Sequence, residues 1–168
     1  MDLKTIQIIG LKVREFAASD CSEALVQECE CLAGCCAVCA RTMQLILEEL
    51  GQESTFVMAS TRTAGHCWTE LELHGQIMVI DTTATQFYCS DSDNDNEDNV
   101  CYADCPEVVI EPLSVYGKRS FVRKLKNYVQ DQDALDSIRR GWTNQSPARY
   151  LGAIDEFVSQ VVSDLRTR

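Results

Sequence analysis

The sequence lacks any long run of apolar residues. Its apolar stretches fall short of the roughly 20 residues that a helix needs to cross a bilayer. Near the N-terminus, charged residues such as Lys4, Lys12 and Arg14 interrupt any signal-like apolar run. The sequence therefore predicts neither a membrane span nor a signal peptide. We expect a mature chain that begins near residue 1 and stays in the cytoplasm.

Positive charge is also scarce. The chain has 15 Lys and Arg residues against 26 Asp and Glu residues, which gives a formal net charge of −11. Binding to a nucleic-acid backbone depends on Lys and Arg, because they displace the counterions of the phosphates. Anionic membrane surfaces likewise attract basic segments. The charge balance therefore argues against nucleic-acid and membrane partners.

The composition is otherwise that of an ordinary globular protein. Hydrophobic residues make up 45% and charged residues 24% of the 168 residues. This length suffices for one hydrophobic core but is short for two. We expect one domain over residues 1–168, with a core segment at about 30–87 and a helical C-terminal part over 118–168.

A densely acidic stretch, SDSDNDNEDN, occupies residues 90–99. Such a segment cannot bury apolar surface, so we expect a mobile loop. Asp91, Asp93 and Asp95 alternate like the opening of a calcium-binding loop, but the glycine at its sixth position and the glutamate at its twelfth are absent. The loop is therefore interpreted as solvated chain, with a cation site as the alternative.

Ten cysteines is a high count for this length. Without a signal peptide we expect reduced thiols, most of them small side chains of the core. A zinc-binding module remains an alternative, because structural zinc takes four such ligands. The closely spaced pairs that could supply them are Cys29 and Cys31, Cys36 and Cys39, and Cys101 and Cys105.

A helix is predicted from Cys36 to Leu50, because apolar residues recur there at helical spacing and Gly51 follows as a C-terminal glycine. A cysteine in the first turn of a helix is favoured as a thiolate by the helix dipole and the unpaired N–H groups. Cys36 is therefore the best-placed nucleophile, and Cys35 and Cys39 are rival thiols.

A β-hairpin is predicted after a short strand at 54–58 and a polar loop at 60–65. Residues 66–73 alternate between two faces, residues 76–81 form the returning strand, and His74-Gly75 reads as the two-residue turn. Such a turn places Asp81 opposite Trp68, with His66 as its diagonal neighbour on the same face at roughly 7–8 Å between backbones. A carboxylate there would fix the tautomer of the imidazole, which could then accept a proton.

Three further segments have weaker patterns. Residues 5–16 fit either a strand or a helix. A strand is expected at 108–110, ended by Pro112, and a helix is expected over 147–165, with Pro147 in its first turn.

Three motifs together resemble those of transglutaminase-like proteins, a papain-related class. Gly34-x-Cys36, with Ala40 and Leu50-Gly51 behind it, resembles the nucleophile helix of that family. The segment HCWTE at 66–70 resembles its His-x-Trp-x-Glu strand. Residues 81–83 resemble its Asp-Pro-Thr, with threonine in place of proline. The resemblance implies an α+β papain-like fold in which the nucleophile helix packs on a small antiparallel sheet, with additional C-terminal helices.

The resemblance also implies a catalytic triad of Cys36, His66 and Asp81 that forms an acyl-enzyme with an amide. We expect a hydrolase, either a peptidase or a protein-glutamine deamidase, that acts on a protein or peptide and needs no metal or cofactor. Acyl transfer of the transglutaminase type and a non-catalytic interaction module are the alternatives. Trp68 is expected to pack beside the triad, and Gln27 is a weak candidate for an oxyanion donor.

Overall fold

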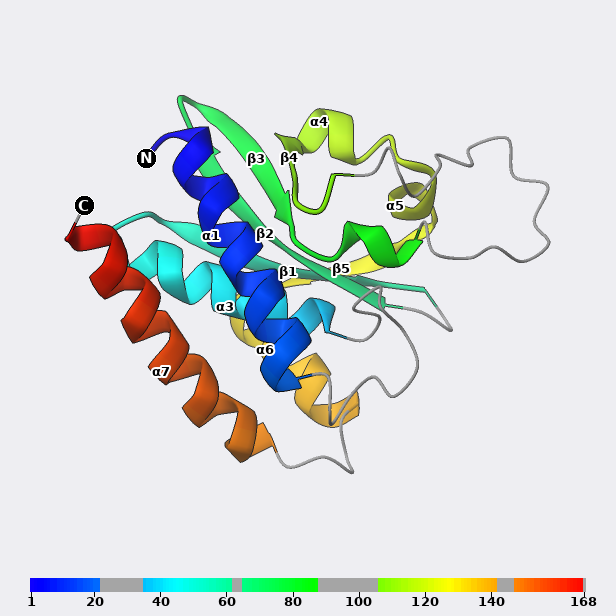
Figure 1. The fold of residues 1–168 in the computed structure, drawn as a ribbon. Helices are drawn as coiled ribbons and strands as arrows, with labels where there is room; N and C mark the ends of the chain where they lie inside the picture. The colour runs from blue at the N-terminus through cyan, green and yellow to red at the C-terminus, as the bar shows by residue number, and fades with distance from the viewer. Residues whose placement is uncertain (22–34, 62–64, 88–105, 142–146, 168) are drawn as a thin grey trace.

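A computed structural model describes residues 1–21, 35–61, 65–87, 106–141 and 147–167 (Figure 1). The fold is α+β, built around a five-stranded antiparallel sheet with the strand order β4-β3-β2-β1-β5. The strands are β1 (Ser54–Ser60), β2 (Gly65–Leu73), β3 (Gln76–Asp81), β4 (Val109–Pro112) and β5 (Lys126–Gln130).

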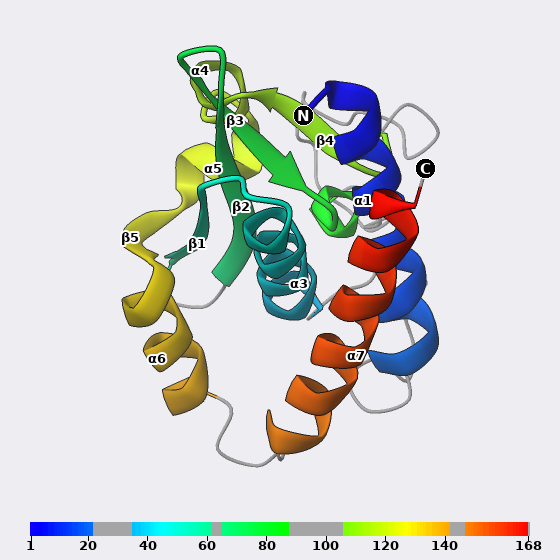
Figure 2. The ribbon, with the colours of Figure 1, turned by 90° about the vertical axis from the view of Figure 1, so that its left-hand side faces the viewer.

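The longer helices lie on one side of this sheet and short ones on the other (Figures 1 and 2). Among the described residues, none of the helices has the length and apolar character that a membrane crossing requires. The helical segments are α1 (Leu3–Phe16), a π-helical turn (Ala17–Cys21), α3 (Cys36–Glu49), a 3-10 turn (Ala84–Phe87), α4 (Leu113–Tyr116), α5 (Ser120–Lys124), α6 (Asp131–Gly141) and α7 (Pro147–Arg166).

The first face of the sheet packs against α3, and α1 and α7 pack on α3 in turn (Figure 2). Leu71 of β2 and Ile80 of β3 are the buried sheet residues in this core. Phe16 of α1 stacks on Phe157 of α7 with ring centroids 4.4 Å apart. The N-terminal segment, which its sequence left open between strand and helix, is therefore helical and closes the core from outside.

The second face of the sheet is covered by the segment that contains α4 and α5. Trp68 of β2 and Val79 of β3 form a buried cluster there with Tyr116 of α4 and Val122 of α5. The sheet is thus buried on both faces near its centre, which explains why the alternation along β2 does not produce a solvent-exposed face at His66 and Trp68.

The predicted hairpin register is confirmed. Leu73 pairs with Gln76 across a two-residue turn, and the ladder continues to Thr69 and Ile80. The turn residues His74 and Gly75 have φ angles of 53° and 77°, as a type I′ hairpin turn requires. This register puts Asp81 on the same face as His66.

The helix predicted from Cys36 is also confirmed, and it ends at the predicted glycine. Gly51 has a φ of 75°, and its N–H donates to the carbonyl oxygen of Glu48 at 2.9 Å. The N–H of Gln52 donates to the carbonyl oxygen of Leu47 at 2.9 Å. These two bonds form a Schellman motif, in which a residue in the left-handed conformation ends the helix.

The C-terminal region corrects one expectation. Residues 118–168 were expected to be helical, but β5 lies within them and pairs with β1, for example through Met58 and Val129. The strand β4 has four residues and includes Pro112, because an edge strand tolerates a proline. The helix expected at 147–165 is present as α7. The acidic stretch 90–99 and its possible cation site lie outside the described residues.

Candidate active site

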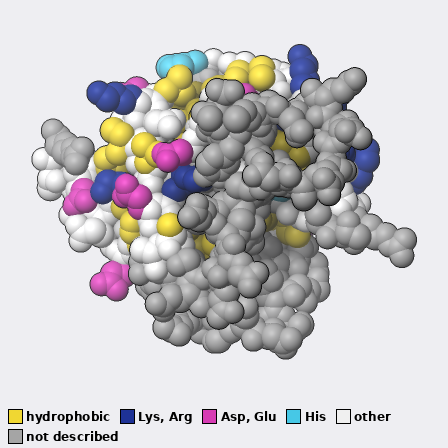
Figure 3. Space-filling model, turned by 45° about the vertical axis from the view of Figure 1, so that its right-hand side comes forward, with side chains coloured by type: hydrophobic (Ala, Val, Ile, Leu, Met, Phe, Trp, Pro, Cys, Tyr) yellow, Lys and Arg dark blue, Asp and Glu magenta, His cyan; other side chains and the backbone are white. Residues whose placement is uncertain are grey.

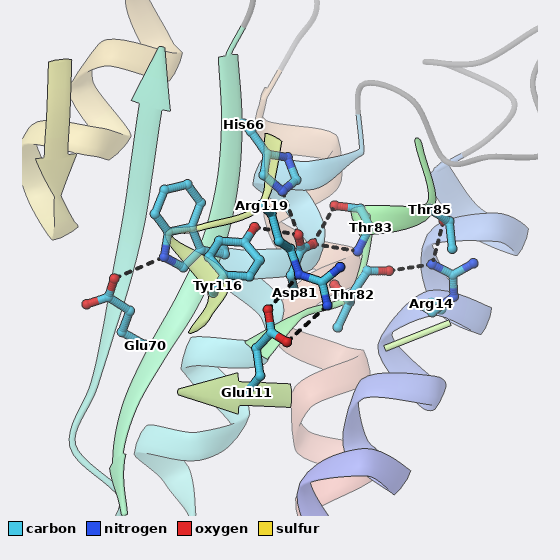
Figure 4. A network of polar contacts seen from close by, with 11 residues as sticks. Arg14, His66, Glu70, Asp81, Thr82, Thr83, Thr85, Glu111, Tyr116 and Arg119 are labelled. Carbon is cyan, nitrogen blue, oxygen red and sulfur yellow. Dashed lines mark hydrogen bonds and ion pairs between the residues drawn. The ribbon is translucent and has the colours of Figure 1, made fainter. Parts of the chain in front are cut away.

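His66 and Asp81 form a buried pair between two neighbouring strands. His66 lies at the start of β2 and Asp81 at the end of β3. The Nε2 atom of His66 is 2.8 Å from Oδ2 of Asp81, and the two side chains are 0% and 1% exposed (Figure 4). Because Nε2 faces the carboxylate, Nδ1 is the ring nitrogen left for proton exchange with another group.

Asp81 has donors on both of its carboxylate oxygens. The Tyr116 hydroxyl donates to Oδ2 at 2.7 Å, the same oxygen that faces His66. The backbone N–H of Thr83 donates to Oδ1 at 2.9 Å. Burial alone would raise the pKa of Asp81, but the charge and hydrogen bond of His66, together with Tyr116 and Thr83, lower it below its ordinary value. Asp81 is therefore an anion at neutral pH.

Cys36 reaches this pair from the other face of the sheet. It is the first residue of α3, whereas pairing of β2 with β3 begins only at Thr69. The start of β2 therefore extends beyond the end of β3, and Cys36 hydrogen-bonds with His66 there. Of the three cysteines at this helix terminus, only Cys36 is partly exposed, whereas Cys35 and Cys39 are buried.

The electrostatics favour a thiolate and an imidazolium. The pKa of Cys36 lies well below its ordinary value, and the largest cause is a hydrogen bond with Cys67. Burial raises this pKa, but the hydrogen bond and the charge of His66 lower it further. Burial would lower the pKa of His66, but Asp81 and the Cys36 thiol raise it to about 10. The two shifts together favour a thiolate–imidazolium ion pair over the neutral thiol and imidazole.

Aromatic side chains enclose the imidazole. The ring centroid of His66 lies 5.9 Å from that of Trp68 and 5.9 Å from that of Phe121, which meets it edge-on. Trp68, expected beside the triad, does pack there and also contacts Tyr116 at 5.5 Å. Its indole N–H donates to Oε1 of Glu70 at 3.0 Å. These rings keep water from His66, which strengthens its interaction with Asp81.

Two arginines stabilise the segments that carry the partners of Asp81 (Figure 4). Arg14 of α1 donates to the carbonyl oxygen of Thr82 at 2.5 Å and contacts the Thr85 hydroxyl at 3.3 Å. Arg119 forms a bidentate ion pair with Glu111, with N···O distances of 2.6 and 3.0 Å. The contacts of Arg14 hold the turn after Asp81. The Arg119–Glu111 ion pair joins the residues on either side of α4, which carries Tyr116.

Sequence reasoning did not find several members of this site. Tyr116 is distant along the chain and has no motif of its own. Thr83 was present in the Asp-x-Thr motif, although its role as a donor to Asp81 was not predicted. Cys67 could have been found from the alternation along β2, which turns it toward the predicted helix.

The remaining candidates from the sequence are not placed at the site. Gln27 lies outside the described residues, so no side chain is assigned here as an oxyanion donor. Within the described ranges, no group of three or more His, Cys, Asp or Glu side chains is arranged to hold a metal ion. Cys29, Cys31, Cys101 and Cys105 of the zinc hypothesis also lie outside those ranges.

Comparison with known proteins does not assign the chain to a family, because no family model, curated protein or solved structure matches it. The fold and the site define it instead: an α+β protein in which a buried Asp–His pair faces a cysteine at a helix N-terminus.

Proposed function

We propose that the protein is a cysteine-dependent amide hydrolase with a papain- and transglutaminase-like arrangement of Cys36, His66 and Asp81. One observation carries this proposal: the buried Nε2–Oδ2 contact of 2.8 Å orients an imidazole that also hydrogen-bonds with Cys36. A thiolate held in this way is a nucleophile at neutral pH. The substrate class that suits it is a protein or peptide with an accessible carboxamide or peptide bond.

In the proposed reaction, the Cys36 thiolate attacks the carbonyl carbon and His66 gives its Nδ1 proton to the leaving nitrogen. The resulting acyl-enzyme is attacked by water, whose proton His66 accepts, and the thiolate leaves as the acyl bond breaks. Asp81 stays ionised throughout and holds the imidazole in one orientation. The first-turn N–H groups of α3 have no acceptor within the helix, so they are suited to the developing oxyanion.

Water is the proposed acceptor, because the resemblance of the three motifs to small transglutaminase-like proteins favours hydrolysis of an amide. A nucleic-acid substrate is disfavoured by the net charge of −11. On the face shown in Figure 3, the Lys and Arg side chains of the described residues lie at several separate places rather than in one patch. Acyl transfer to an amine remains the alternative outcome of the same acyl-enzyme.

A labelling experiment tests the nucleophile. At mildly acidic pH, iodoacetamide should alkylate Cys36 ahead of the other nine cysteines, because ordinary thiols are protonated there. His66→Ala should slow the labelling of Cys36 by at least about tenfold, whereas His74→Asn, at the exposed hairpin turn, should leave it unchanged. Peptide mass spectrometry gives the rate for each cysteine. Equal, slow labelling of all cysteines would contradict the proposal.

A second experiment tests the reaction. The protein is incubated with a cell lysate and an excess of labelled primary amine, and mass spectrometry scores peptide cleavage, Gln-to-Glu conversion and amine incorporation. Cleavage or deamidation should dominate and should vanish in Cys36→Ala but persist in Cys39→Ala, since Cys39 is buried in the same helix. Dominant amine incorporation would instead support a transferase. Identical results with Cys36→Ala would support an interaction module.

A further inference from the structure

A second thiol lies beside Cys36, on the strand that carries His66. Cys67 follows His66 in β2, so its side chain points to the opposite face of the sheet, which α3 covers. Cys67 belongs to an apolar cluster with Ala37 and Ala40 of α3, and Cys36 packs against this cluster. Both cysteines are free thiols. Two reduced sulfurs therefore share one side of the candidate site.

The packing of α3 over β2 explains why they meet. The Thr69 hydroxyl donates to the carbonyl oxygen of Ala40 at 2.8 Å, which fixes the helix over the strand at that level. Four residues back along the helix, Cys36 lies about 6 Å away. Two residues back along the strand, Cys67 lies about 7 Å away. Both steps end in the same cluster, so the two cysteines lie close together.

The two thiols differ in exposure and in ionisation. Cys36 is partly exposed, whereas Cys67 is 3% exposed. A hydrogen bond with Cys36, burial and the charge of Cys36 raise the pKa of Cys67 well above its ordinary value, whereas the pKa of Cys36 is lowered. Cys36 is therefore favoured as the thiolate, and Cys67 is favoured as the protonated thiol.

We propose that Cys36 and Cys67 form a dithiol site that reduces small hydroperoxides such as hydrogen peroxide. The Cys36 thiolate attacks one peroxide oxygen, and the O–O bond breaks to give a Cys36 sulfenic acid and hydroxide. The His66 imidazolium protonates that hydroxide to water.

The Cys67 sulfur then attacks the Cys36 sulfur, the S–S bond forms, and the S–O bond breaks. The hydroxide released combines with the Cys67 proton as a second water. A small thiol reductant, such as glutathione, restores both thiols by exchange.

The first step activates the second. The Cys36 thiolate is a main cause of the raised pKa of Cys67. A sulfenic acid is neutral, so its formation removes that charge and lowers the pKa of Cys67 toward its ordinary value, which favours attack by its sulfur. The proposal shares the Cys36 thiolate with the proposed hydrolase but does not depend on acyl-enzyme chemistry. Formation of the disulfide would block the hydrolase nucleophile until it is reduced.

The test uses the full chain, fully reduced and then freed of reductant. Hydrogen peroxide is added in slight excess at neutral pH, free thiols are alkylated, and the digest is searched for linked peptides. We expect a linkage between Cys36 and Cys67 that forms in the wild type and disappears after dithiothreitol. In Cys67→Ala and Cys67→Ser the linkage should be lost, and dimedone should trap a sulfenic acid at Cys36. Further peroxide should convert this sulfenic acid to a sulfinic acid, which dithiothreitol does not reverse. Two variants are used because either change could impair folding at this buried position.

Cys39→Ala is the matched control, because it removes a buried cysteine from the same helix and should leave the linkage unchanged. Direct conversion of wild-type Cys36 to sulfinic acid, or linkage of Cys36 to Cys35 or Cys39 instead, would overturn the proposal. The amide assay is run in parallel on reduced protein. A Cys36–Cys67 disulfide without amide hydrolysis would contradict only the hydrolase, and hydrolysis without the disulfide would contradict only the dithiol site.

Discussion

Asp81 is the residue on which the proposed chemistry depends most. It is 1% exposed and still ionised, because its two oxygens accept hydrogen bonds from Tyr116 and Thr83 in addition to the contact with His66. A buried carboxylate without such donors would take up a proton. It would then no longer support an imidazolium at His66.

The Tyr116 hydroxyl should therefore contribute more to stability than a surface hydroxyl does. Tyr116→Phe keeps the ring in its buried cluster but removes the donor to Oδ2 of Asp81. Hydrogen bonds to charged groups are worth about 1.5–3 kcal/mol. We expect the free energy of unfolding, measured with urea at neutral pH, to fall by about that amount.

Tyr128→Phe is the matched control for this change. Tyr128 also contacts Trp68, at 5.9 Å between ring centroids, but it is 55% exposed. Loss of its hydroxyl should change the free energy of unfolding by less than about 0.5 kcal/mol. Equal losses of stability in both variants would contradict a stabilising role for the hydrogen bond from Tyr116 to Asp81.

At the scale of elements, the parts that sequence predicted are those with local signals. The hairpin register depends on the turn His74-Gly75, and the end of α3 depends on Gly51, both of which have positive φ angles. The strand β5 has no such signal: it is short, mostly exposed and formed by pairing with β1 from a distant part of the chain. Its partner, rather than its own sequence pattern, determines its conformation.

The end of α3 gives a prediction about one element. Gly51→Ala would force a side chain into a φ of 75°, although no atom would lie within 4 Å of the new Cβ. The expected loss is about 1–2 kcal/mol in the free energy of unfolding, from backbone strain alone.

Gly65→Ala serves as the control, because its Cβ would meet only ordinary contacts, the nearest at 3.5 Å, and its φ is not positive. That variant should be neutral or slightly stabilised. Equal losses in both would contradict the assignment.

At the scale of the whole molecule, the site joins the two faces of the sheet. Cys36 comes from α3 on one face, and Tyr116 and Phe121 come from the segment that covers the other. Sequence could predict the His66–Asp81 pair because a single hairpin produces it. It could not predict Tyr116, because that contact depends on how a later segment folds over the sheet.

The ion pair at this junction should affect how stability depends on pH. The pKa of His66 is raised from 6.5 to about 10, so its contribution to stability is fully present below about pH 6.5 and is lost as the pH rises toward 10. The pKa of Cys36 is lowered from 9.0, so its contribution is present above pH 9 and is lost as the pH falls through the lowered value. Between the two ordinary values the two contributions change with pH in opposite directions, so they offset each other in the wild type.

Cys36→Ser should remove this cancellation, because serine does not titrate while Asp81 still raises the pKa of His66. The free energy of unfolding of the variant should then fall relative to the wild type, by up to about 1.4 kcal/mol per pH unit above about pH 6.5. Urea unfolding of both proteins at about pH 6.5, 7.5 and 8.5 measures the difference between their curves. Cys39→Ser, in which the Cys36–His66 pair is intact, should follow the wild-type slope. If Cys36→Ser also followed that slope, His66 would be neutral in the folded variant, and Asp81 alone would not hold it as an imidazolium.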